Sequence, residues 1–114
     1  MPMGSDDPTL QMRLKRVLEA ATKPISYGRL ARDLDVPGPG AIARVTNALE
    51  ALMQDDAAAG RPFLASMCEG KLLDGLPALG FFQMAASLGR YSGSSTGPDA
   101  VAFVMQQRAM LGRG

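Results

Sequence analysis

The chain has 114 residues, of which 46% are hydrophobic and 20% charged, and its formal net charge is +1. This length and composition predict one folded domain and exclude an intrinsically disordered chain. With a single cysteine, Cys68, and no histidine, the sequence excludes an intrachain disulfide and offers no zinc site, so neither a metal nor a cofactor is expected. No segment has the pattern of a signal peptide or a membrane span, and we expect a cytoplasmic protein without membrane contact.

Residues 1–8 are expected to be a flexible N-terminus and residues 9–114 a single domain. The domain opens with a helix, because apolar residues recur at helical spacing on one stripe: Leu10, Leu14, Val17, Leu18 and Ala21. Lys23 precedes a proline, which pushes it away from helical backbone angles, so the helix ends there.

Residues 26–55 predict a helix-turn-helix. Ser26 can cap a short helix from Tyr27 to Leu34. Residues 36–40 read Val-Pro-Gly-Pro-Gly and cannot continue a helix, since proline lacks the amide donor and glycine favours turns. A longer helix from Ala41 to about Asp56 is then indicated by five apolar residues at helical spacing: Ile42, Val45, Leu49, Leu52 and Met53.

Residues 62–73 are expected to form a wing. The stretch 62–68 is extended in character, and Lys71–Leu73 either pairs back on it as a small hairpin or leaves a single strand with a loop. Two C-terminal helices follow at about 81–89 and 98–111, joined by a mobile surface loop. The last helix is expected to supply apolar contacts from Val101, Val104 and Met105, with Leu111 or Phe103. The predicted fold is therefore mainly α with a small β-hairpin: a winged helix-turn-helix core plus two C-terminal helices.

Six residues of the helix-turn-helix are candidates for contact with DNA. Arginine and tyrosine can hold backbone phosphates, and threonine and asparagine can approach base edges. The phosphate set is Tyr27, Arg29, Arg32 and Arg44, and the base-reading set, which Arg44 can join, is Thr46 and Asn47. Because Glu50, Asp55 and Asp56 would be repelled by phosphates, the helix would have to enter a groove by its N-terminus. The alternative is that these side chains only form a solvated helix surface.

Catalysis has little support in the sequence. There is no histidine, and no pair of carboxylates or nucleophile with a base has the spacing that catalysis requires. Cys68 lies in an apolar segment next to Glu69, whose negative charge favours the protonated thiol, so a buried structural cysteine is expected. We therefore expect a protein that is not an enzyme.

The segment Pro24-Ile-Ser-Tyr-Gly-Arg-Leu-Ala31, with Pro37 and Arg44-Val-Thr-Asn-Ala-Leu49 after it, resembles the DNA-binding region of the methylated-DNA-protein cysteine alkyltransferases. The resemblance covers about a quarter of the chain and implies a winged-helix shape. It also implies that Tyr27 contacts the phosphate of a target nucleotide and that an arginine-bearing helix enters the minor groove. Arg44 lies one place from the family's arginine, and the reactive Pro-Cys-His-Arg motif is absent, so repair activity is not implied.

A looser resemblance covers more of the chain. The order of the Tyr27-Gly-x-Leu-Ala31 helix, a long helix, Gly60-Arg-Pro-Phe-Leu-Ala65 and Gly75-Leu-Pro-Ala-Leu-Gly-Phe-Phe82 is similar to small uncharacterised bacterial proteins of the same layout. It implies no activity. Leu76 to Phe82 is expected to be a loop that closes the core beside the wing.

These observations favour a non-catalytic DNA-binding protein, such as a transcriptional regulator, with double-stranded DNA as its partner. The alternative is a protein-interaction or homodimerisation module, in which the C-terminal helix pairs with a second copy or another chain. Apolar residues on more than one face of that helix motivate the alternative.

Overall fold

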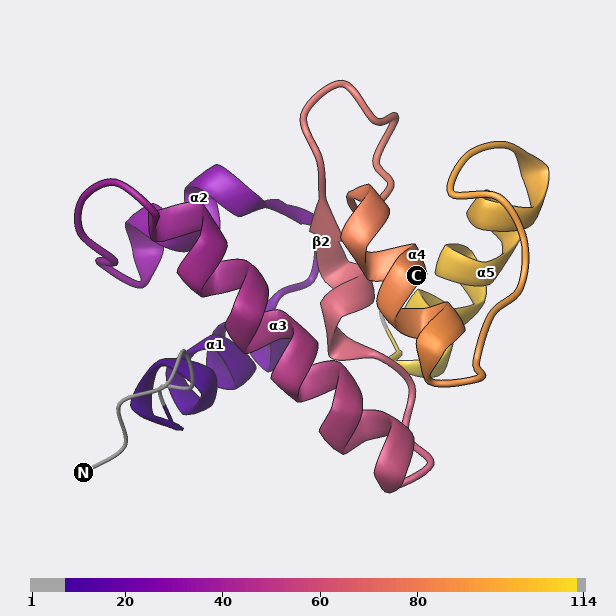
Figure 1. Cartoon of the computed structure of the whole chain (residues 1–114), viewed down its shortest axis with the longest axis horizontal. Coiled ribbons are helices and arrows are strands. Elements are labelled where there is room, and N and C mark those ends of the chain that lie inside the picture. The colour runs from indigo at the N-terminus through magenta and orange to yellow at the C-terminus, as the bar shows by residue number, and fades with distance from the viewer. Residues whose placement is uncertain (1–7, 113–114) are drawn as a thin grey trace.

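A computed structural model describes residues 8–112. In chain order the elements are α1 (Pro8–Ala20), β1 (Ile25–Ser26), α2 (Tyr27–Asp33), α3 (Ala41–Ala58), the 3₁₀ turn η1 (Leu64–Met67), β2 (Cys68–Glu69), α4 (Leu79–Ser87) and α5 (Pro98–Met110) (Figure 1). The protein is mainly helical, as expected, with a small parallel sheet of β1 and β2. The expected flexible N-terminus, 1–8, lies outside the described residues except for Pro8, where α1 begins.

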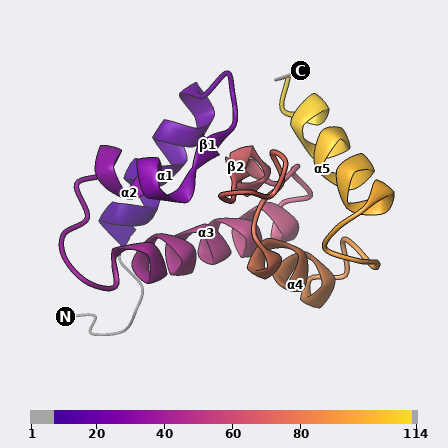
Figure 2. The ribbon, with the colours of Figure 1, turned by 90° about the horizontal axis from the view of Figure 1, so that it is seen from above.

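Helix α3 organises the molecule. Figure 2 shows α1 and α2 beside one part of α3, and α4 and α5 toward its other end. The turn η1 packs against α1, α3 and α5, so it joins the N-terminal helices to the C-terminal ones. The core therefore lies around η1, between the two groups of helices.

The N-terminal half follows the sequence pattern. Leu14, Leu18 and Leu30 are completely buried, which confirms the apolar stripes of α1 and α2. Ser26 caps α2 as expected: its Oγ accepts a hydrogen bond of 3.1 Å from the backbone N–H of Arg29. The glycine before α3, Gly40, has φ of +83°. Glycine adopts this left-handed conformation without strain, so the chain can turn sharply into the long helix.

The prediction of a β-hairpin in residues 62–73 is wrong. Residues 63–68 are buried, and buried backbone groups must find partners. The backbone N–H of Leu64 donates to the Asp56 carboxylate at 3.1 Å, and that of Phe63 donates to Gln107 Oε1 at 2.9 Å. The segment is thereby held as a 3₁₀ turn inside the core and is not an extended strand.

The strand that follows pairs with the N-terminal half of the chain. Ile25 pairs with Cys68 and Ser26 with Glu69, in parallel register. Residues 70–76 then form turns, in which Leu73 N–H donates to Gly70 and Leu76 N–H to Leu73. The structure thus has a single strand with a loop where a hairpin wing was expected, and Figure 1 shows this loop extending beyond β2.

The C-terminal helices lie close to their expected positions, but the buried face of α5 differs. Val104 is buried, whereas Val101 and Met105 are 45% and 52% exposed. The buried face instead carries Gln107 and Arg108, because these polar side chains bond to backbone groups of the segment around η1. Leu76, Pro77, Phe81 and Phe82 are buried, which agrees with the expected closing role of residues 76–82. The expectation that the whole segment is a loop is wrong, because residues 79–82 form the first turn of α4.

Candidate functional site

Of the six candidate DNA-binding residues, four are exposed on helix surfaces and two are half-buried. Arg29 and Arg32 are exposed on α2, and Arg44 and Asn47 are exposed on the first turns of α3. Tyr27 and Thr46 are half-buried and line one pocket. The structure therefore brings Tyr27 beside Thr46 in this pocket and beside Arg32 in a second hollow, while Arg29, Arg44 and Asn47 remain apart on the surface of the two helices.

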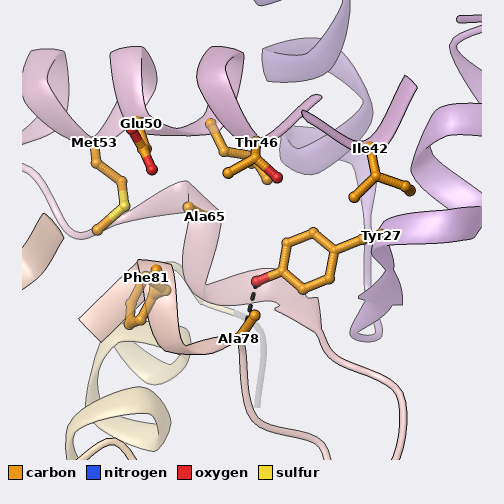
Figure 3. Close-up of a pocket in the computed structure, with 10 residues that line it drawn as sticks. Tyr27, Ile42, Thr46, Glu50, Met53, Ala65, Ala78 and Phe81 are labelled. Atoms are coloured by element: carbon orange, nitrogen blue, oxygen red, sulfur yellow. Dashed lines mark hydrogen bonds between the residues drawn. The ribbon is translucent and has the colours of Figure 1, made fainter. Parts of the chain in front are cut away.

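The hydroxyl of Tyr27 is part of the internal hydrogen-bond network. Its oxygen accepts a bond of 2.9 Å from the backbone N–H of Ala78 (Figure 3). Burial raises the pKa of Tyr27 above its usual range, and the nearby Cys68 adds to this effect, while the bond from Ala78 and the charge of Arg108 oppose it. The phenol therefore keeps its proton, which it can still donate to an oxygen acceptor.

The basic side chains of α2 differ in their surroundings. Arg29 Nε lies 3.5 Å from the carboxylate of Asp33, and both side chains are exposed, so this pair contributes little to stability. Arg32 lines a hollow between the start of α2 and the loop after β2, together with Lys71, Glu69 and Asp74. Within residues 8–112 neither Arg32 nor Lys71 forms an ion pair.

The pocket of Tyr27 and Thr46 lies under α3, between α2 and the start of α4. Its volume is about 120 Å³. Apolar side chains make up most of its surface, and the lining is Tyr27, Ile42, Thr46, Leu49, Glu50, Met53, Ala65, Ala78, Gly80 and Phe81. In Figure 3 the rings of Tyr27 and Phe81 lie on opposite sides of this space, with Thr46 and Glu50 reaching toward it from α3.

Glu50 is the one lining residue of the pocket that carries a formal charge. Its side chain is half-buried and lies close to the start of α4: a methyl group placed on Gly80 would be 3.9 Å from Glu50 Oε2. It forms neither a hydrogen bond nor an ion pair with another residue of the described range. The sequence placed Glu50 on the exposed side of the helix that would face DNA, where its charge would repel phosphates, so its place in an apolar pocket was missed.

A second residue missed in the sequence is Arg108, which is buried at the end of α5. Its Nε donates to the carbonyl oxygen of Ser66 at 2.7 Å, and its Nη2 donates to that of Gly75 at 2.7 Å and to that of Cys68 at 3.4 Å. Burial lowers the pKa of Arg108, and the negative charge of Glu69 partly opposes this effect. The guanidinium thus acts as a structural clamp on η1, β2 and the loop that follows.

Cys68 is completely buried, as expected. Burial raises the pKa of its thiol to about 12, an effect that the charge of Arg108 reduces. The thiol is therefore protonated at neutral pH because of its burial, and not because of the charge of Glu69 as the sequence suggested. In the described part of the chain no three potential metal ligands lie together, and no helix there has the length and apolarity to cross a membrane.

Comparison of the chain with protein-family models, with curated proteins and with solved structures finds no match. The class that the fold defines is a mainly helical protein with a small two-stranded parallel sheet.

Proposed function

We propose that the chain is a non-catalytic DNA-binding protein, such as a transcriptional regulator, that presents the first turns of α3 to a DNA groove. The observation that carries this proposal is the exposure of Arg44 and Asn47 on α3. Residues three apart are neighbours on a helix surface. Arginine can bond to O6 and N7 of guanine, and asparagine to N6 and N7 of adenine, so the two side chains supply the groups that base recognition uses.

The start of α3 suits a negatively charged partner. Its N-cap is Gly40, which offers no side-chain cap, and its first turn holds no acidic residue. The free N–H groups and the positive end of the helix dipole therefore favour an anion such as a phosphate. Asp55 and Asp56 lie near the other end of the helix, away from such a contact.

Residues outside α3 would hold the DNA backbone. Arg32 and Lys71 line the hollow between α2 and the loop after β2, and Arg29 can exchange its exposed partner for a phosphate. The alkyltransferase resemblance assigns Tyr27 a phosphate contact, but its hydroxyl lies inside the protein against the backbone N–H of Ala78, so the arginines and Lys71 carry this role in the proposal. Because Glu69 and Asp74 line the same hollow, α3 is expected to supply most of the affinity.

Titration of fluorescent duplex DNA, followed by anisotropy at several salt concentrations, tests the proposal. Affinity should fall as salt rises, because phosphate contacts release counterions. Arg44→Ala should weaken binding, and it should lower the salt slope by about 1 where the contact is to a phosphate. Asn47→Ala should leave the slope unchanged and lose about 1–3 kcal/mol of discrimination between sequences.

Arg16→Ala is the matched control, since Arg16 is exposed on α1 and its loss changes the net charge equally. Binding that is absent at low salt, or unaffected by salt, would rule out the proposal. Equal effects of Arg16→Ala and Arg44→Ala would contradict the role of α3.

A second candidate function is a homodimerisation module, favoured by exposed apolar side chains around one hollow. Leu72, Leu79 and Val101 line this hollow and are 91%, 56% and 45% exposed. Exposed apolar patches mark interaction sites. Sedimentation at several concentrations, with Leu72→Ser and Val101→Ser, tests it: wild type should associate and the variants should not, and a wild-type monomer at all concentrations excludes this function.

A further inference from the structure

The pocket under α3 combines an apolar interior with one carboxylate. Its deeper surface is formed by Met53, Ala65 and Phe81, each almost completely buried. Its volume of about 120 Å³ is close to the roughly 150 Å³ of an apolar cavity that binds a molecule of the size of benzene, and is too small for a nucleotide or a folded peptide segment. A short aliphatic chain of about four or five carbons fits this volume and matches its apolar surface.

Glu50 defines the charge of such a ligand. A carboxylate beside apolar surface attracts a cation more strongly than it would in bulk water, because the surroundings screen the charge less. Thr46 supplies a hydroxyl oxygen on the same side of the pocket (Figure 3). The rings of Tyr27 and Phe81 present further surface that attracts cations. An anionic group would meet Glu50 unfavourably, and a neutral alcohol would gain nothing from its charge.

We propose that this pocket binds a primary alkylammonium group, with the aliphatic chain against Met53 and Phe81 and the ammonium donating to Glu50. Thr46 Oγ1 accepts a second hydrogen bond from the same ammonium. The source of the group is a free aliphatic amine or a lysine side chain. This site does not depend on the proposed binding of DNA, since it is tested without DNA.

The dipole of α4 limits the affinity of the site. The positive end of this helix lies near Glu50, since α4 begins at Leu79 and its N-cap, Ala78, offers no side-chain cap. It offsets part of the carboxylate's charge. For a ligand of about six non-hydrogen atoms we therefore expect a dissociation constant on the order of a millimolar.

Titration of the ¹⁵N-labelled protein with n-pentylammonium, followed by amide chemical shifts, tests the proposal. Saturable shifts should appear at Thr46, Ala78, Gly80 and Phe81. Pentan-1-ol should bind at least tenfold more weakly, because it has the same chain length without the charge. Ethylammonium should also bind at least tenfold more weakly, because it leaves the apolar interior unfilled.

Two variants of the pocket sharpen the test. Glu50→Gln should lower the affinity for n-pentylammonium at least tenfold, whereas Asp55→Asn, which removes a carboxylate from the exposed face of the same helix, should leave it unchanged. Gly80→Ala places a methyl group 3.9 Å from Glu50 Oε2, an ordinary contact distance, so the variant should fold and bind several-fold more weakly.

A derivative of lysine with both backbone ends blocked distinguishes the two sources. Binding of this derivative at least as tight as that of n-pentylammonium assigns the site to a lysine side chain, and weaker binding assigns it to a free amine. Both results support the alkylammonium site. Equal binding of pentan-1-ol and n-pentylammonium, unchanged binding to Glu50→Gln, or no saturable shift at the pocket overturns it.

Discussion

The backbone N–H of Ala78 donates a hydrogen bond of 2.9 Å to the phenolic oxygen of Tyr27. Tyr27 is the first residue of α2, and Ala78 is the N-cap of α4, so one side chain joins α2 to the start of the C-terminal helices. The same ring forms one side of the pocket under α3 (Figure 3). The position of α4 relative to α3 therefore depends on a tyrosine that the sequence suggested only as a contact to DNA.

Tyr27→Phe should destabilise the protein by about 1–3 kcal/mol, because the ring still fits and the amide of Ala78 loses its acceptor. Urea unfolding followed by circular dichroism measures this change. Tyr91→Phe is the control, since the Tyr91 hydroxyl donates to Ser94 within a surface loop and its loss should change the midpoint much less. Equal midpoints for Tyr27→Phe and wild type would contradict the assigned role of the bond.

Arg108→Met should lower the free energy of unfolding by about 3 kcal/mol. The variant keeps a long side chain but removes charged donors from the buried carbonyl oxygens of Ser66 and Cys68 and the partly buried one of Gly75, and an unpaired buried acceptor is costly. Thermal unfolding measures the loss of stability in Arg108→Met. The control is Arg16→Met, which replaces an exposed arginine of α1. A variant as stable as the control would show that the clamp contributes nothing.

Asp56→Asn should destabilise the end of α3 by about 2 kcal/mol. The Asp56 carboxylate is buried and accepts bonds of 3.1 Å both from Arg61 Nε and from the backbone N–H of Leu64. An amide group can accept only one of them well and places its own NH₂ against the other donor. Asp55→Asn changes the neighbouring exposed residue, whose exposed bond from Gln11 an amide oxygen can still accept, and should have little effect on urea unfolding. Equal losses in the two variants would contradict this account.

Stability should fall in alkaline solution. Burial raises the pKa of Cys68 from 9.0 to about 12 and that of Tyr27 above its usual 10.0. Above pH 9 the unfolded chain therefore loses the thiol proton while the folded protein keeps it, so unfolding becomes easier, by up to about 1.4 kcal/mol per pH unit for each such group. The loss begins near pH 9 and continues to about pH 12.

Urea unfolding at several pH values between pH 8 and pH 11 measures how the free energy of unfolding depends on pH, and the slope can be compared with the one that proton linkage predicts. Cys68→Ala should remove the part that begins near pH 9 and leave the part that begins near pH 10 from Tyr27. A slope identical in Cys68→Ala and wild type would show that the thiol is not the titrating group.

Local patterns in the sequence predict the helices well. The apolar stripe of α1, the Ser26 cap of α2 and the proline and glycine turn before α3 all depend on residues a few positions apart, and the structure confirms each. The segment around η1 could not be predicted in this way. Its conformation depends on Asp56, Gln107 and Arg108, polar residues whose partners are distant in the sequence.

The candidate site was predictable only in part. Exposure of Arg44 and Asn47 follows from the helical spacing of the apolar residues before, between and after them, such as Val45 and Leu49, and the structure agrees. Thr46 lies between these residues in sequence but turns toward the pocket, since α4 packs against that side of α3. Only the tertiary packing brings Glu50 and Thr46 together with Tyr27.

The parallel register of Ile25 with Cys68 and of Ser26 with Glu69 has a consequence for synthesis of the protein. A parallel pair needs a long crossover, and here α2 and α3 form it. Until Glu69 has emerged from the ribosome, the nascent chain lacks β2. We therefore expect α1, α2 and α3 to reach their final arrangement only after most of the polypeptide has been released, as one cooperative unit with η1 and α5.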